Sequence, residues 1–184
     1  MRKLLFVLTL TLVFSFSQSV LALLVHTTHF KEGSEPDGFR GIKWGKKPSN
    51  KYGLVEVEAE DLDGHLKTYE RKGEKKSIAD ADIVSIQYEF FKNKFCAARV
   101  KSHGEANWHA LRSAMWERFG KNEASYFRDR QLNQTPDYYE WVGKETEITL
   151  RYAPEVSDYI GLDITSTKID AKRQEYQRLR QNDL

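Results

Sequence analysis

The sequence predicts an α+β domain, with an antiparallel sheet of about seven strands built from sequential hairpins, one packed amphipathic helix and a C-terminal helix. Three observations favour this class. Several short segments alternate apolar and polar residues, and turn-forming residues separate them. Only two segments have helical periodicity, and they interrupt runs of strands instead of alternating with single strands. One cysteine in 184 residues excludes a disulfide scaffold.

The first 22 residues have the order of a secretory signal peptide. Arg2 and Lys3 precede an apolar run, residues 4–16, and a more polar passage then ends in Val20-Leu21-Ala22. We place the cleavage site after Ala22. A retained membrane anchor is the alternative, which the run disfavours because a span needs about 20 apolar residues.

Removal of this segment changes the charge balance. The whole chain has 29 Lys and Arg residues against 27 Asp and Glu residues, whereas the mature chain of 162 residues would have 27 of each. No later apolar run has membrane-spanning length, so we expect a soluble exported protein, periplasmic or secreted, without a membrane span after cleavage. A neutral chain lacks the basic composition of nucleic-acid-binding domains, so we expect no nucleic-acid partner.

The pattern divides the chain into four parts: the signal peptide (1–22), an irregular N-terminal segment (23–38), a single α+β domain (39–166) and a C-terminal helix with a tail (167–184). Gly33 to Gly38 contains turn-forming residues. Phe39 to Gly45 alternates apolar with polar or small residues, which predicts either a short strand or an aromatic plug on the core.

Two hairpins are predicted before the first helix. Leu54–Glu60 alternates, and its apolar residues Val55, Val57 and Ala59 should face the core, after which Leu66–Arg71 returns. The second hairpin pairs Ile83–Phe91 with Phe95–Lys101 around a turn in which Asn93 tolerates positive φ. We expect one face of this hairpin to carry Val84, Ile86, Tyr88, Phe90, Cys96, Ala98 and Val100, with Cys96 buried and unreactive.

The packed helix should run from about His103 to Phe119. Ser102 and Glu105 have the spacing of a capping box, and Gly120 provides the stop. At 100° per residue the apolar side chains form one narrow stripe that should lie on the sheet. The stripe consists of Trp108, Leu111, Met115 and Phe119, with Trp116 on its shoulder and partly accessible.

A third hairpin, Tyr138–Val142 with Glu145–Tyr152, should close through a type II′ turn at Gly143-Lys144. That register places Trp141 opposite Thr146 and Glu140 opposite Glu147. It also predicts one buried face made of Tyr139, Trp141, Ile148, Leu150 and Tyr152. A last strand, Tyr159–Thr165, precedes a charged helix from Lys168 to about Gln181 that Thr167 caps, anchored by Ile169, Tyr176 and Leu179.

Motifs for catalysis are absent from the sequence. It contains no P-loop, GxGxxG, GxSxG, HExxH or CxxC, so phosphate cradles, nucleophile elbows and thermolysin-type zinc sites have no support. His103, Glu105 and His109 form the best titratable cluster, which predicts either a metal site or an ordinary helix start. His26 and His29 are two imidazoles without a third ligand, so surface histidines are the favoured reading.

Two further features are candidates for binding. Glu140, Glu145 and Glu147 would form an acidic patch on the third hairpin, either solvated or facing a basic partner or cation. Trp116 could offer a stacking platform for a glycan, although aromatics at helical spacing are usually core residues.

Four segments carry a family resemblance. They are Gly38-Phe39-Arg40-Gly41-Ile42-Lys43-Trp44-Gly45, Ile86-Gln87-Tyr88-Glu89-Phe90-Phe91, Leu111 to Lys121, and Tyr139-Glu140-Trp141-Val142-Gly143. With the exported start, the chain resembles, from about Gly38 to Ser166, a group of small uncharacterised exported bacterial proteins. The resemblance implies a location in the bacterial envelope and assigns no functional residues.

The leading hypothesis from the sequence is a non-catalytic periplasmic domain that binds a protein partner or a small ligand on its sheet or hairpin surface, without a cofactor. One alternative is a metal-dependent or hydrolytic envelope enzyme using His103, Glu105 and His109. The other is a glycan-binding module using Trp116.

Overall fold

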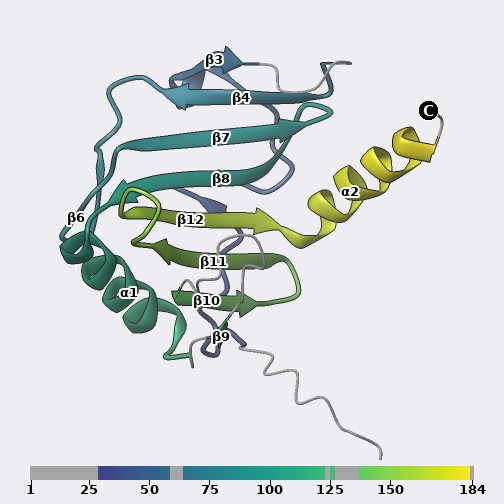
Figure 1. Cartoon of the computed structure of the whole chain (residues 1–184). Helices are drawn as coiled ribbons and strands as arrows, with labels where there is room; N and C mark the ends of the chain where they lie inside the picture. The colour runs from purple at the N-terminus through teal and green to yellow at the C-terminus, as the bar shows by residue number, and fades with distance from the viewer. Residues whose placement is uncertain (1–28, 59–63, 123–124, 127–136, 183–184) are drawn as a thin grey trace, which may run out of the picture.

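The computed structural model describes residues 29–58, 64–122, 125–126 and 137–182 (Figure 1). The predicted signal peptide, His26 and Ala59 lie outside the described residues. The strands are β1 (Gly38–Phe39), β2 (Ile42–Lys43), β3 (Leu54–Glu58), β4 (Leu66–Arg71), β5 (Ser77–Ile78), β6 (Ala81–Asp82), β7 (Ser85–Phe91), β8 (Lys94–His103), β9 (Ser125–Tyr126), β10 (Asp137–Val142), β11 (Thr146–Ala153) and β12 (Tyr159–Ser166). The helices are a 3₁₀ turn (Asn50–Tyr52), α1 (Glu105–Phe119) and α2 (Thr167–Asn182).

One large antiparallel sheet organises the molecule, in the order β3-β4-β7-β8-β12-β11-β10-β9. Seven of its strands have five or more residues, and the two-residue β9 adds an edge, so the predicted α+β class is confirmed. The chain builds β3, β4, β7 and β8 as one meander, and after α1 it builds β9 to β12 as a second. The last strand, β12, then pairs with β8 and joins the two halves into one sheet (Figure 1).

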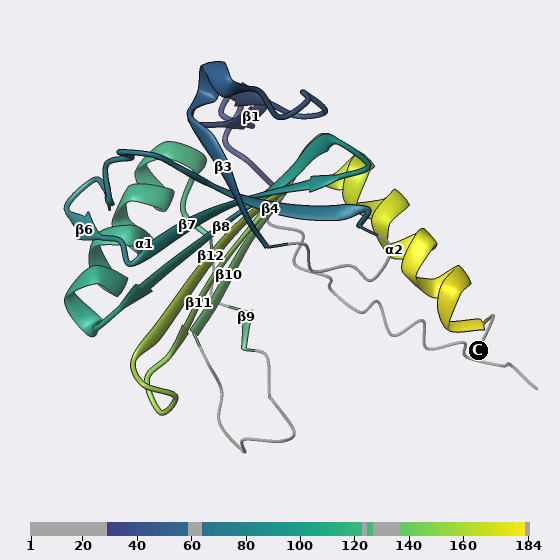
Figure 2. The same ribbon diagram turned by 90° about the horizontal axis from the view of Figure 1, so that it is seen from above.

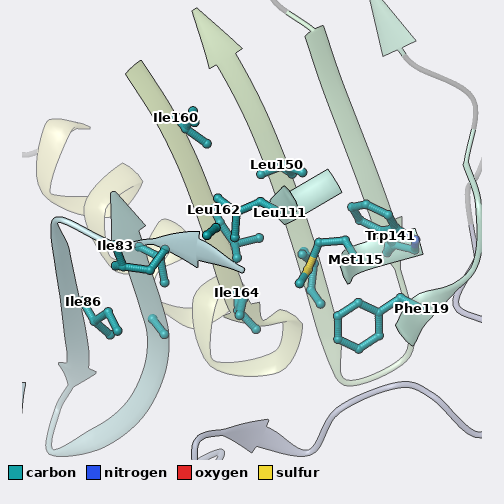
Figure 3. Close-up of a cluster of buried hydrophobic side chains, with 14 of the residues drawn as sticks. Ile83, Ile86, Leu111, Met115, Phe119, Trp141, Leu150, Ile160, Leu162 and Ile164 are labelled. Atoms are coloured by element: carbon teal, nitrogen blue, oxygen red, sulfur yellow. The ribbon is translucent and has the colours of Figure 1, made fainter. Parts of the chain in front are cut away.

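The main hydrophobic core lies between this sheet and α1. The predicted helical stripe is confirmed, since Trp108, Leu111, Met115 and Phe119 are all buried against the sheet. Trp108 stacks on Tyr152 with ring centroids 5.3 Å apart. Figure 3 shows how the side chains of α1 interdigitate with those of β10, β11 and β12. The burial of these large side chains away from water stabilises the packing of α1 on the sheet.

The second helix packs on the opposite face of the sheet (Figure 2). A smaller cluster of Leu66, Phe91, Cys96 and Ala97 receives only Ile169 and Tyr176 from α2. The predicted third anchor, Leu179, is 54% exposed, so that part of the prediction is wrong. Neither described helix combines the length and apolar composition that a membrane-spanning helix needs.

The segment before β3 is a short hairpin fastened to the sheet, so both sequence expectations hold in part. β1 and β2 pair, and Phe39 and Trp44 pack on core rings of the sheet. The Arg40 guanidinium donates to Glu74 Oε1 at 2.9 Å and to the Ser77 carbonyl at 2.7 Å. Glu74 also accepts a hydrogen bond from the Tyr88 hydroxyl.

A β-bulge in the second hairpin corrects the predicted position of Cys96. The Lys92-Asn93 turn has positive φ at both residues, as a type I′ turn requires, but the β7–β8 register shifts between Glu89 and Phe90. The shift turns Cys96 away from the face of Ala98 and Val100 and into the cluster under α2. Burial is confirmed: the thiol is inaccessible, donates to the Glu89 carbonyl, and burial raises its pKa to about 12.

The predicted burial of three valines is wrong because these residues lie at the margins of the sheet. Val55 and Val57 are 53% and 49% exposed on β3, which lies at the edge of the large sheet. Val84 is 60% exposed because it precedes β7, and Ile83 is buried in its place.

The third hairpin has the predicted faces but a different register. Trp141 pairs with Ile148 and Tyr139 with Leu150, a shift of two residues, so the same side chains still face the core. The turn is therefore Lys144-Glu145, closed by a hydrogen bond from the Gly143 N–H to the Thr146 carbonyl.

The predicted capping box of α1 is also wrong. β8 continues to His103, so Ser102 is a buried strand residue whose hydroxyl donates to the Asp82 carbonyl. Gly104 occupies the N-cap position without a side-chain cap, and Glu105 is the first helical residue. Gly120 ends the helix as predicted.

Candidate functional site

Three parts of the chain that are distant in sequence meet at one end of the sheet. The β7–β8 turn lies there because β8 starts at Lys94. Since β12 is antiparallel to β8, it ends at the same place, where Thr165 pairs with Ala97 and α2 begins. Ser166 in turn pairs with Thr146, so the β10–β11 turn is the third part (Figure 1). Antiparallel topology alone thus gathers two turns and one helix start.

A cavity of about 480 Å³ lies at this end, and we call it the lysine pocket. Its volume is within the ordinary range for small-ligand sites, roughly 300–1,000 Å³. Its lining combines cationic and apolar groups. The residues are Trp44, Gly45, Phe91, Lys92, Lys94, Lys144, Glu145, Ser166, Lys168, Ile169 and Lys172.

The five lysines of this pocket are exposed and carry a concentrated positive charge. Within the part of the chain that the structure describes, none of them has a carboxylate within 4 Å. Among the described residues, rings lie near the ammonium of Lys92, with the ring centres of Tyr176 and Phe91 at 4.4 and 5.3 Å. Glu145 is the single acidic residue of the lining, so the pocket has a formal charge of +4.

Trp44 forms a fixed aromatic wall of the pocket. Its indole stacks on Phe95 with ring centroids 4.8 Å apart, and its Nε1 donates to Thr146 Oγ1 at 2.8 Å. The Gly45 N–H donates to the Phe95 carbonyl at 2.9 Å, which binds the Trp44 backbone to the start of β8. Because both ends of the indole are held, its orientation is set before any ligand arrives.

Two hydrogen bonds to backbone carbonyls also fix the start of α2 at the pocket. The Thr167 N–H donates to the Glu145 carbonyl at 3.1 Å, and its hydroxyl donates to the Lys144 carbonyl at 3.0 Å. This attachment holds the β10–β11 turn beside the first helical turn. The partial positive charge of a helix N-terminus adds to that of the lysines.

The N-terminal segment supports the same turn from outside. The Glu35 carboxylate accepts hydrogen bonds from the N–H groups of Glu145 (2.6 Å) and Thr146 (2.9 Å). A Cβ on Gly143 would overlap this carboxylate and come 2.8 Å from a ring carbon of Phe30. A side chain at 143 would therefore force the Glu35 carboxylate, which is held by two hydrogen bonds, to move.

The pocket is chemically suited to binding an anion. Its lining offers ammonium groups, a buried serine and one carboxylate, with no histidine or cysteine among the lining residues. Lysine is a compact, mobile point charge that pairs with carboxylates, phosphates or sulfates without demanding bidentate geometry.

The acidic patch expected on the third hairpin is divided. Glu140 and Glu147 lie near each other, and burial, followed by the charges of Glu140 and Asp170, raises the pKa of Glu147. The Tyr138 hydroxyl donates to Glu140 Oε1 at 3.0 Å, and burial together with this carboxylate raises the Tyr138 pKa. Glu145 instead lies in the turn at the lysine pocket.

Beside Glu147 an ion-pair ladder crosses the sheet on the α2 side. Arg99 pairs with Glu89 at 3.0 Å and with Asp163 at 3.5 Å, and Arg151 pairs with Asp163 at 2.8 Å. Arg173 joins Glu89 from α2 at 3.4 Å. These charges already have partners, so the ladder serves the packing of the sheet face.

The titratable cluster at the end of β8 and the start of α1 is not assembled as a metal site in the described structure. His109 and Glu105 are 3.5 Å apart but 51% and 78% exposed, while His103 Nδ1 lies 2.9 Å from the Ser157 carbonyl. Within the described ranges no group of three His, Cys, Asp or Glu side chains could hold a metal ion. His29 lies 3.4 Å from the Val142 carbonyl.

Trp116 is partly accessible, as predicted, but its ring already has cationic neighbours. The Arg112 guanidinium lies 4.9 Å and the Lys121 ammonium 5.4 Å from the ring centre. Its Nε1 is buried without a hydrogen-bond partner in the described structure. These contacts disfavour a free stacking platform for a glycan.

Sequence reasoning missed the lysine pocket although a signal was present. Both hairpin turns carry lysine, at 92, 94 and 144, and two more lysines lie on one side of α2 at 168 and 172. The strand order that brings these lysines to one end of the sheet could not be predicted from the hairpins alone. It depends on the pairing of β12 with β8.

In comparisons with known proteins, no family model, no curated protein and no solved structure matches the chain.

Proposed function

We propose that this protein is an exported, non-catalytic domain that binds a small anionic ligand in the lysine pocket. The observation that carries the proposal is the group of five lysines without carboxylate partners around a cavity of about 480 Å³. Unpaired like charges repel one another, so an anion that neutralises them gains attraction and relieves repulsion together.

The position of the pocket supports a binding role. It is formed by turns and a helix start, yet its wall is rigid because Trp44, Glu35 and Thr167 are held by hydrogen bonds. Pre-organised groups lose little freedom when a ligand binds. The predicted mature chain is neutral, so the attraction is local to this pocket and salt should weaken it.

Binding can be tested by calorimetry and thermal unfolding with pyrophosphate and citrate as probes. We expect either probe to bind and to raise the Tm, and the affinity to fall as NaCl increases from 50 to 300 mM. In the double variant Lys94→Ala/Lys144→Ala the affinity should fall at least tenfold. The matched control is Lys72→Ala/Lys101→Ala, which removes two exposed lysines outside the pocket lining and should bind like the wild type.

Two results would overturn the binding proposal. One is the absence of any heat or Tm change with either probe. The other is equal loss of affinity in the pocket variant and the control, which would indicate general charge attraction.

Export is the second part of the proposal, and it rests on the order of residues 1–22. Expression of the full chain in a bacterium, followed by fractionation and N-terminal sequencing, tests it. We expect a periplasmic or secreted product that begins at Leu23. A cytoplasmic product that still carries Met1 would contradict export.

A further inference from the structure

We infer that the ligand of the lysine pocket has a flat ring with anionic groups on two sides, and that the ring lies against Trp44. This inference rests on the proposed function and narrows it to a class of ligand. It follows from where the indole lies relative to the two lysine-bearing turns.

The lysines come from both sides of the pocket. Lys94 begins β8, whereas Lys144 lies two residues before the start of β11, and β12 lies between these strands. Neighbouring strands are about 4.8 Å apart, so β8 and β11 run about 10 Å from each other. A ligand that contacts both turns therefore gains most if it has negative groups at both ends.

Trp44 bridges the space between the two turns. It stacks on Phe95, the second residue of β8, and hydrogen-bonds to Thr146, the first residue of β11. The indole is half-buried and lines the cavity, so its uncovered part faces the ligand. Phe91 and Ile169 add apolar surface to the same lining. A flat ring matches this platform, because stacking on an aromatic wall is favourable beyond simple burial.

Three small probes separate the contributions of ring and charge. Naphthalene-2,6-dicarboxylate has a flat ring and two anionic groups, 2-naphthoate has the ring and one group, and octanedioate has two groups without a ring. We expect calorimetry to show the first binding at least tenfold more tightly than either of the others.

Variants then assign each contribution to a side chain. Trp44→Leu should weaken naphthalene-2,6-dicarboxylate at least fivefold and leave octanedioate nearly unchanged, while Trp44→Phe should retain most of the ring preference. Trp116→Leu, a second half-exposed tryptophan outside the pocket lining, is the control and should not alter binding. Lys144→Ala should reduce the advantage of the dianion over 2-naphthoate. Circular dichroism and the Tm show that each variant is folded.

The outcomes distinguish this inference from the function on which it rests. If all anions bind in a lysine-dependent way and the ring gives no advantage, the inference is wrong and the proposed function stands. If naphthalene-2,6-dicarboxylate binds no more tightly than 2-naphthoate, the inferred anionic groups on two sides of the ring are wrong. If no anion binds through these lysines, the proposed function itself fails.

Discussion

Glu147 shows how a single residue can oppose the stability of the fold. It is half-buried on β11, and burial, with the neighbouring charges of Glu140 and Asp170, raises the pKa of its carboxyl above 4.5. The folded state therefore retains the proton at a pH where the unfolded chain has released it. The free energy of unfolding must then decrease as the pH rises from about 4.5 through the raised pKa.

Replacing Glu147→Gln should stabilise the protein above that pH window. We expect a gain in the free energy of unfolding at pH 7 and no gain below pH 4, where both side chains are neutral. Urea unfolding at several pH values measures the difference. Glu155→Gln, at an exposed position in the β11–β12 turn, is the control. A Glu147→Gln gain that persists unchanged at pH 3 would contradict this explanation.

Gly143 matters for a different reason, since the Glu35 carboxylate occupies the space of a side chain there and would have to move. Gly143→Ala should cost about 1–3 kcal/mol, the usual range for overpacking. A double-mutant cycle with Glu35→Ala separates this clash from other effects. We expect the alanine at 143 to cost at least 0.5 kcal/mol less when Glu35 is absent, and strictly additive costs would be evidence against the clash.

At the scale of elements, the two helices are held by very different amounts of packing. α1 buries four large apolar side chains in one stripe, and its period could be predicted from the sequence. α2 contributes only Ile169 and Tyr176 to the smaller cluster on the opposite face, and the remainder of its surface is charged or exposed. Its position therefore depends on a few contacts, one of which also lines the lysine pocket.

This contrast predicts unequal effects of two similar substitutions in α2. Ile169→Ala should lower the free energy of unfolding by about 1–2 kcal/mol, because the side chain packs on the cluster. Leu179→Ala removes a side chain that is 54% exposed and should change it by less than about 0.5 kcal/mol. Chemical denaturation of both variants provides the measurement, and equal effects would mean that the helix is anchored elsewhere.

At the scale of the whole molecule, β8 and β12 unite two meanders into one sheet. The main core cluster includes side chains from both halves, such as Tyr88 of β7 and Leu150 of β11, and Leu162 lies at the junction. Because this core is continuous, neither meander has a separate hydrophobic core that would keep it folded without the other.

We therefore expect one unfolding transition for the whole domain. Calorimetric and van't Hoff enthalpies should agree, and Leu162→Ala should lower the single Tm, at a cost of roughly 2–5 kcal/mol, without splitting the transition. Tryptophan fluorescence and far-ultraviolet circular dichroism should give the same midpoint. Two separate transitions would show that the halves fold independently.

Local patterns in the sequence determined most of the elements. Alternation in β4, β7, β11 and β12 and the stripe of α1 are consequences of periods two and 3.6, which each segment carries within itself. The exposure of Val55 and Val57 could not be predicted in this way, because alternation shows which residues share a face and not whether another element covers it.

Only the tertiary structure decided where the chemistry lies. The bulge at Cys96, the two-residue register shift at Trp141 and the contact between Glu35 and Gly143 all depend on residues that pair or pack across the chain. The same holds for the lysine pocket, whose cations come from separate turns and a helix. The sequence alone determined the fold class and the presence of lysines in the hairpin turns. The pairing of β12 with β8 gathered those turns into one site, because hydrogen bonding between distant strands sets which ends of the chain become neighbours.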